Sequence, residues 1–95
     1  MKEFKMSDNN ILCPGCNGEG MHHKRVEVFN REEEDCSNGL HVEVEGQCLK
    51  SNRDLIGNPS SRRSGVVITM TCEDCLHSFD LNIYQHKGRT FLEWQ

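Results

Sequence analysis

The chain has 95 residues, of which 35% are hydrophobic and 27% are charged. This length suits one domain, and so few apolar residues build only a thin core. The formal net charge of −4 argues against a protein whose whole surface binds nucleic acid. A chain this poor in apolar side chains usually needs disulfides or a metal to hold its fold, and six cysteines are available for either purpose.

The sequence indicates a reducing compartment, and this favours a metal over disulfides. Residues 1–20 hold no apolar run of signal-peptide length, and no stretch approaches the ~18 apolar residues of a membrane span. We therefore expect a cytoplasmic protein with no membrane segment. Cysteine pairs in that reducing compartment are typically metal ligands or redox groups rather than structural disulfides.

In chain order, the pattern first predicts a loose polar arm at 1–10 and then a single domain over 11–95. Apolar and polar residues alternate at 24–30 and again at 40–46, which is the pattern of two half-buried strands. An Asn-Gly turn signal at 38–39 separates these two segments. The sequence therefore predicts a hairpin with a long loop.

The second half of the chain begins with residues 48–65, which are rich in Ser, Arg and Asn and are expected to form a long loop. The β-branched run at 66–72 is the strongest strand candidate. Alternation at 78–85, a tight turn at 86–89 and a last strand at 90–94 complete the chain. Because no segment shows a helical period, the sequence predicts a mainly β fold, a small antiparallel sheet of about five strands.

Two Cys-x-x-Cys pairs stand out, Cys13 with Cys16 and Cys72 with Cys75. This spacing lets two thiolates of one tight turn reach the same tetrahedral ion at ~2.3 Å, and two pairs form a closed shell of four cysteines. The sequence therefore predicts two zinc knuckles that share one structural zinc ion per chain, in a zinc-ribbon-like fold. Such zinc binding is worth about 10–16 kcal/mol, so the metal-free chain should be largely unfolded. The choice between zinc and iron stays open at this point.

The stretch CPGCNGEG at 13–20 resembles the CxxCxGxG motif that repeats in the cysteine-rich domain of DnaJ-type co-chaperones. The resemblance covers eight residues and matches Cys13, Cys16, Gly18 and Gly20. It implies that the two cysteines bind metal, since two such repeats share a zinc in that family. The second pair lies in CEDCLHSF, which lacks both glycines, so the resemblance extends to metal binding and not to a chaperone function.

A closed shell of four cysteines leaves no coordination position for water or substrate, so we expect a non-catalytic module that binds a protein partner. The alternative is a nucleic-acid-binding zinc ribbon that holds phosphates with basic residues of the 50–63 segment and the 86–89 turn. These residues are Lys50, Arg53, Arg62, Arg63, His86, Lys87 and Arg89. A zinc or redox enzyme is a third class, and it requires a three-ligand site or a thiol of lowered pKa.

Several histidines also have the chemistry of metal ligands. His41 and Glu43, followed later by CxxC, resemble part of the zinc-deaminase signature. Thr71 stands where that signature has proline, however, and a strand over 40–46 would place both side chains on a solvated polar face. The adjacent histidines at 22–23 are expected to be solvated rather than ligands.

Cys36, Cys48 and His77 remain. Cys36 and Cys48 should not form a disulfide, because an extended segment 40–47 spans roughly 25 Å and bridged Cα atoms lie within about 7 Å. We expect Cys36 to be a free thiol beside the acidic run at 32–35, which is interpreted as a solvated loop. His77 lies close enough in sequence to Cys75 to hydrogen-bond the sulfur shell.

Overall fold

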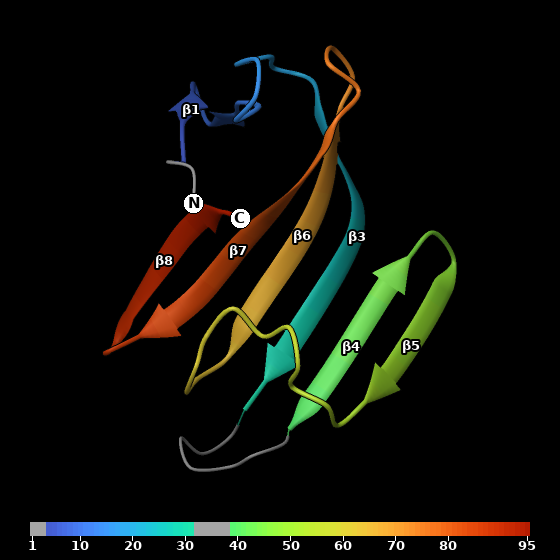
Figure 1. Cartoon of the computed structure of the whole chain (residues 1–95), viewed down its shortest axis with the longest axis vertical. Helices are drawn as coiled ribbons and strands as arrows, with labels where there is room; N and C mark the ends of the chain where they lie inside the picture. The colour runs from blue at the N-terminus through green and yellow to red at the C-terminus, as the bar shows by residue number, and fades with distance from the viewer. Residues whose placement is uncertain (1–3, 32–38) are drawn as a thin grey trace.

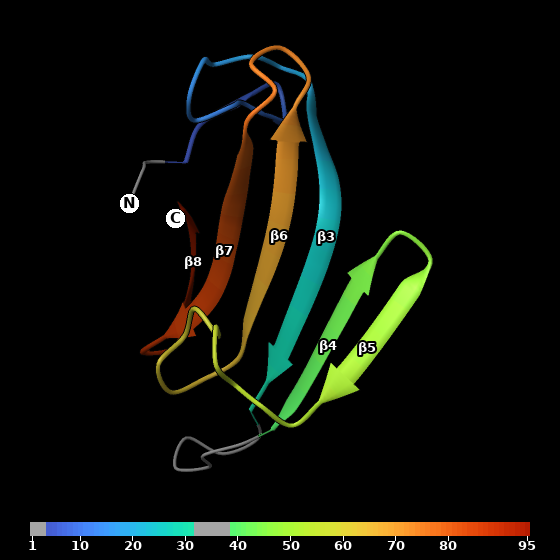
Figure 2. The same cartoon turned by 45° about the vertical axis from the view of Figure 1, so that its right-hand side comes forward.

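The computed structural model of the chain describes residues 4–31 and 39–95. The described strands form a six-stranded antiparallel sheet in the order β5-β4-β3-β6-β7-β8 and a small sheet of β1 and β2 (Figures 1 and 2). Their bounds are β1 Met6–Ser7, β2 Asn10–Ile11, β3 Met21–Asn30, β4 Leu40–Glu45, β5 Cys48–Asn52, β6 Gly65–Cys72, β7 Ser78–His86 and β8 Arg89–Trp94. The predicted mainly β fold is confirmed, and the described residues form eight strands instead of about five.

The predicted hairpin is present as β3 and β4, with Val28 paired to Val42. β3 begins earlier than the alternation indicates, at Met21, and its pairing with β6 shifts register between His23 and Arg25. The acidic run at 32–35 and Cys36 lie outside the described residues. Among those that the structure describes, no helix has the length and apolar character needed to cross a membrane.

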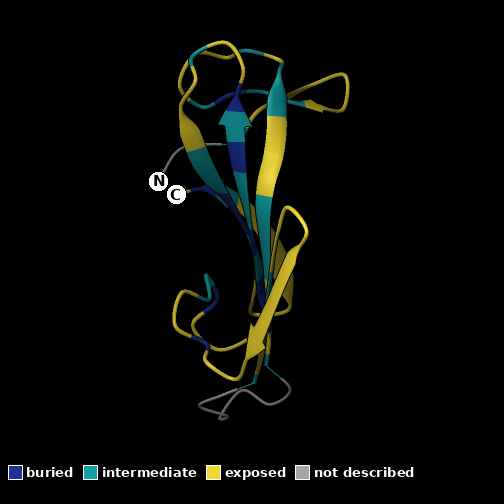
Figure 3. Ribbon diagram, turned by 90° about the vertical axis from the view of Figure 1, so that its right-hand side faces the viewer, coloured by how far each residue is buried: buried dark blue, intermediate teal, exposed yellow. Residues whose placement is uncertain are grey.

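The prediction of a loop over all of 48–65 is wrong at its beginning, because Cys48–Asn52 forms β5. All five residues of this strand are exposed, since β5 is an edge strand that pairs only with β4 (Figure 3). An edge strand without a buried face shows no apolar alternation in its sequence. The sequence does contain one signal for this strand, the glycine at position 46. Gly46 has φ +60° in the tight turn between the paired residues Glu45 and Cys48, a conformation that favours glycine.

Residues 6–11, most of which the sequence assigns to a loose arm, form the β1–β2 hairpin. Its turn residues Asp8 and Asn9 have φ values of 49° and 65°. Asp and Asn adopt this left-handed conformation more readily than most residues, and two such residues in succession are typical of a tight hairpin turn. The ring of Phe4, just before β1, lies 6.3 Å from that of Trp94, so this segment packs on the end of the main sheet.

Two small apolar clusters lie on opposite faces of the main sheet. Val67 of β6 packs with Phe29 and Leu55, the last contributed by the segment after β5. Met70, three residues further along β6, packs with Leu81 and Trp94 on the other face. Successive side chains of a strand point to opposite faces, which places these two clusters back to back. The core is therefore thin on both sides, as the composition predicts.

On the face that carries Trp94, Phe4 and Ile11 pack over the end of the sheet near the knuckles. Further along the sheet, the register aligns a row of apolar side chains on this face, from Val42 of β4 to Leu92 of β8, and Val44 and Leu49 lie in the next row. This open apolar face consists of Val28, Val42, Val44, Leu49, Val66, Ile83 and Leu92. Four of its members, in β3, β4, β5 and β8, are exposed large hydrophobic residues.

Candidate metal centre

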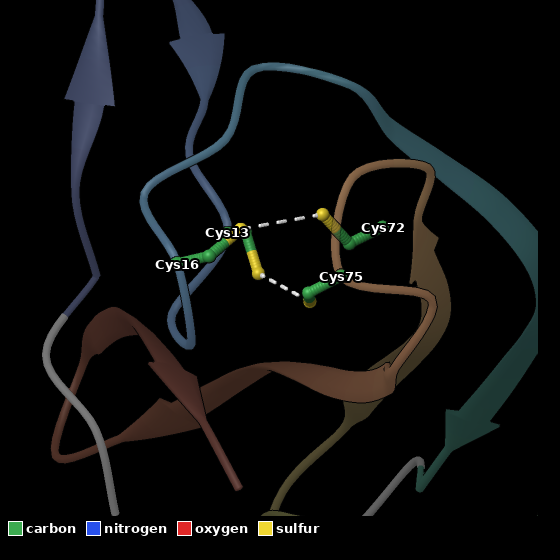
Figure 4. A group of neighbouring side chains, drawn as sticks. All are labelled: Cys13, Cys16, Cys72 and Cys75. Atoms are coloured by element: carbon green, nitrogen blue, oxygen red, sulfur yellow. Dashed lines mark hydrogen bonds between the residues drawn. The ribbon is translucent and has the colours of Figure 1, made fainter.

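The first knuckle is a tight turn closed by two backbone hydrogen bonds. The N–H of Cys13 donates to the carbonyl of Gly18 at 2.9 Å, and the N–H of Asn17 donates to the carbonyl of Cys13 at 2.9 Å. Asn17 takes the left-handed conformation with φ 62°. This geometry reverses the chain within six residues and brings the side chains of Cys13 and Cys16 to the same side (Figure 4).

The second knuckle repeats this backbone arrangement. The N–H of Cys72 donates to the carbonyl of His77 at 3.0 Å, and the N–H of Leu76 donates to the carbonyl of Cys72 at 2.9 Å. Leu76 has the same φ, 62°, as its counterpart in the first knuckle. Two segments of unlike sequence therefore fold into the same turn, because the Cys-x-x-Cys spacing and its hydrogen bonds are local.

The four sulfur atoms converge between the two knuckles (Figure 4). The Sγ atoms of Cys13 and Cys75 lie 3.7 Å apart, as do those of Cys16 and Cys72, and all four lie within 4.8 Å of one another. These thiols are free, and 3.7 Å is well beyond the ~2.05 Å of a disulfide. Four sulfurs at ~2.3 Å from one tetrahedral ion would be about 3.8 Å apart, so the spacing fits zinc.

Neighbouring thiols of this cluster shift the pKa values of Cys13 and Cys16. Burial raises the pKa of the Cys13 thiol, but hydrogen bonds from the backbone of Cys16 and Gly15 and from the neighbouring thiols outweigh it and lower the pKa to about 7. At Cys16 the N–H of Gly18 lowers the pKa, yet burial and the three other thiols raise it to about 12. One thiolate thus forms at the expense of its neighbours, since like charges this close repel. A bound cation would allow all four to ionise.

Backbone N–H groups complete the shell of the sulfurs. The N–H of Gly15 donates to Cys13 Sγ at 3.3 Å, and the backbone N–H of His77 hydrogen-bonds the Cys75 thiol. The sequence predicts a hydrogen bond from His77 to this shell. In the structure its donor is the backbone N–H of His77 and not the imidazole ring. The imidazole ring of His77 lies edge-on to Phe79 at 6.5 Å. The pKa of Cys75 is nevertheless raised, because burial and the thiols of Cys13 and Cys72 outweigh that bond.

The two glycines of the CxxCxGxG resemblance lie where the first knuckle contacts the second. A Cβ atom at Gly18 would lie 2.3 Å from Asp74 Oδ2, and one at Gly20 would lie 2.4 Å from Glu73 Cγ. The N–H of Glu73 donates to the carbonyl of Gly20 at 3.0 Å. In this chain the glycines therefore let the two knuckles approach closely, which brings the four sulfurs together.

The other candidate ligands lie outside this cluster. Among the described residues, the four cysteines are the one group of three or more metal-ligating side chains. His22, on β3, forms an exposed pair with Glu73 at 2.8 Å, and its neighbour His23 is exposed, as expected. Cys48 is exposed in β5.

His41 differs from the prediction of a solvated side chain. Its ring stacks on Phe29 at 4.3 Å, and its Nε2 lies 3.2 Å from Glu27 Oε1. The face shared by His41 and Glu43 is the one that buries Phe29, so an aromatic neighbour across the strand pair covers the imidazole. This accounts for the histidine without a metal, and the deaminase arrangement is absent from the described residues.

The basic residues of the nucleic-acid alternative divide into two groups. Arg62, Arg63, His86 and Lys87 line one hollow, and Arg89 joins Arg63 in an adjoining one. Lys50 and Arg53 line neither hollow. Lys50 lies on β5, opposite Glu43 of β4.

Comparisons of the chain with protein-family models, with curated proteins and with solved structures found no match. The centre is therefore defined by its own geometry. Four cysteines of two matching knuckles lie within metal-binding distance of one another, as in a zinc-ribbon-like site.

Proposed function

We propose that Cys13, Cys16, Cys72 and Cys75 bind one zinc ion as a closed structural centre, and that the chain is a non-catalytic zinc-binding module. The observation that carries the proposal is the pair of 3.7 Å sulfur–sulfur distances, each joining one knuckle to the other. Cys16 and Cys72 are 56 residues apart in sequence. A zinc ion bound there would cross-link the beginning of the chain to the β6–β7 connection.

The thin core explains why such a cross-link matters. Apart from cysteines, the buried apolar side chains of the described residues form two clusters of three residues each. Zinc bound by a structural site is worth about 10–16 kcal/mol, as much as the whole stability of a typical domain. Zinc binding would therefore supply most of the free energy that keeps this chain folded.

Catalysis at the metal is not expected, because four protein ligands fill a tetrahedral zinc. Cys13 has the thiol of lowered pKa, but it is only 1% exposed. A redox role for it is disfavoured because a reactive thiol must be accessible to its substrate. A protein partner and a cytoplasmic location stay predictions. The open apolar face supports the first of these, because exposed apolar patches are typical of interaction sites.

Native mass spectrometry with and without a chelator tests the proposal, together with alkylation of the folded protein. We expect one zinc per chain, with the four knuckle cysteines protected and Cys48 reactive. The mass of the bound metal distinguishes zinc from iron, which thiolate shells also bind. A metal-free protein with intact strands, or a metal that protects only three cysteines, would contradict the closed structural centre.

A further inference from the structure

Two adjoining hollows lie at the end of β7 remote from the metal centre, between the 61–63 segment and the β7–β8 turn. The larger has a volume of ≈ 470 Å³ and is lined by Arg62, Arg63 and Lys87, among others. The second has a volume of ≈ 220 Å³ and is lined by Arg89 and, again, by Arg63. Arg63 and Gln85 line both hollows, so the two adjoin in one depression of the surface.

The depression is strongly basic in an acidic protein. Its walls carry four permanently cationic side chains, three arginines and one lysine, together with His86. Among the described residues, no acidic side chain lines either hollow. The chain as a whole has a formal charge of −4, so this concentration of positive charge is local. A concave surface that gathers cationic side chains attracts ligands of negative charge.

The backbone that carries these cations is held in place. The buried hydroxyl of Ser60 donates to the carbonyl of Gln85 at 2.8 Å and accepts the N–H of Arg63 at 2.9 Å. The guanidinium of Arg31 donates to the carbonyl of Ser61 at 3.0 Å. The segment is thereby fixed against β7 before any ligand arrives, which lowers the entropy lost on binding.

We propose that this depression binds successive phosphate groups of single-stranded nucleic acid. The planar guanidinium matches two phosphate oxygens at once, so arginine-rich hollows suit phosphates better than single carboxylates or halides. Arg63 and Gln85 line both hollows, so successive phosphates of one strand can each meet one of the four cations. The proposal does not depend on which metal occupies the cysteine cluster.

An aromatic pair beside the depression favours a single strand. The rings of Tyr84 and Phe91 stack at 5.6 Å with an interplanar angle of 26°, and Phe91 is 37% exposed. Phe91 and Arg89 are two residues apart on β8 and so lie on the same face, about 7 Å apart along the strand. An unpaired base can stack on such a ring, whereas the bases of a duplex are already stacked on one another.

Fluorescence anisotropy of a labelled single-stranded oligonucleotide, titrated with the zinc-loaded full chain, tests the proposal. Four phosphate contacts predict a slope of about −2.8 for log Kobs against log salt concentration, at about −0.7 per contact. Affinity should therefore fall about 50-fold between about 50 and about 200 mM salt.

A double variant and its charge-matched control separate the contribution of the depression to binding from that of the net charge. Arg62→Gln with Arg63→Gln removes two contacts, so the same increase in salt should weaken binding only about sevenfold. The control Lys50→Gln with Arg53→Gln makes the same change in net charge outside the hollows and should keep the wild-type slope. Circular dichroism and zinc content confirm that both variants are folded.

A third variant, Phe91→Leu, tests the stacking platform. The variant keeps an apolar side chain, and its affinity for the oligonucleotide should be lower by about fivefold or more. Tripolyphosphate, which has no bases, should bind this variant and the wild-type protein equally.

Several results would overturn the proposal: no oligonucleotide binding at low salt, equal losses in the Arg62/Arg63 variant and its control, or wild-type affinity in Phe91→Leu. Tighter binding of duplex DNA, tripolyphosphate or anionic lipid vesicles than of the single strand would also overturn it, and would assign the hollows to that ligand instead.

Discussion

Replacing Leu76 by asparagine should stabilise the zinc-loaded protein. Leu76 holds the left-handed position of the second knuckle at φ 62°, and Asn17 holds the matching position of the first at the same angle. A branched, bulky side chain is strained in this region, whereas asparagine adopts it more readily. The substitution would give the second knuckle the residue that the first already has.

The expected gain can be worked out from the conformation and the exposure of Leu76. The left-handed conformation costs a non-glycine residue about 1–2 kcal/mol, most of which asparagine recovers. Leu76 is 78% exposed. Removing its buried fifth therefore loses only about 0.5 kcal/mol of the 1.5–3 kcal/mol for a fully buried leucine. The net stabilisation is about 1 kcal/mol, or about 4–8 °C in Tm for a domain of this size.

Thermal unfolding at a fixed free zinc concentration, followed by Trp94 fluorescence, measures this shift. The zinc concentration must be held constant because a bound metal changes the apparent stability. Leu76→Ala is the matched control, since it loses the same small contact and keeps the strain, so its Tm should fall slightly. The reciprocal change Asn17→Leu should cost about 1 kcal/mol. If Leu76→Asn lowers the Tm as far as Leu76→Ala does, backbone strain at position 76 does not reduce the stability of the protein.

Three further predictions concern the metal centre. Chelation should abolish the β-sheet circular dichroism signal and shift the emission of the buried Trp94 to longer wavelength, and a native spectrum after complete metal removal would contradict the structural role. Cys72→Ser should lower the zinc affinity at least tenfold in a chelator competition, while Cys48→Ser, which changes an exposed residue of β5, should leave it unchanged. The raised pKa values of Cys16, about 12, and of Cys75 keep both thiols protonated at neutral pH, so zinc binding should release at least these two protons and strengthen as pH rises from about 6 to about 8. Calorimetry in two buffers of different ionisation enthalpy counts the protons, and no release would refute the thiolate shell.

Strands with a buried face were predictable from the sequence, whereas exposed or very short strands were not. The buried strands β6 and β7 were predictable because each has an apolar face against the core, which leaves a period of two in the sequence. β5 was missed because it is an exposed edge strand whose residues face solvent along its whole length. The β1–β2 hairpin was missed because its strands have two residues each, too short for any period.

The sequence by itself determined which four cysteines could hold a metal ion and the turns that carry them. A Cys-x-x-Cys pair directs two thiols to one ion within a single turn, and the knuckle hydrogen bonds span only a few residues. Such local geometry needs no tertiary contact, which is why unlike sequences at 13–18 and 72–77 fold alike. The tight turn at 86–89 was predictable for the same reason, with φ 51° at Lys87 and 76° at Gly88.

Only the tertiary structure decided which distant residues meet. Arg62 and Arg63 lie beside Lys87 because the Ser60 hydroxyl bonds the carbonyl of Gln85, a contact between segments 25 residues apart. Lys50, at the other end of the same basic segment, lies in β5 instead. No spacing rule in the sequence tells which of these basic residues join the hollow and which do not. The apolar period of a sequence reflects local structure, whereas the positions of loops on a sheet depend on hydrogen bonds between residues that are distant in sequence.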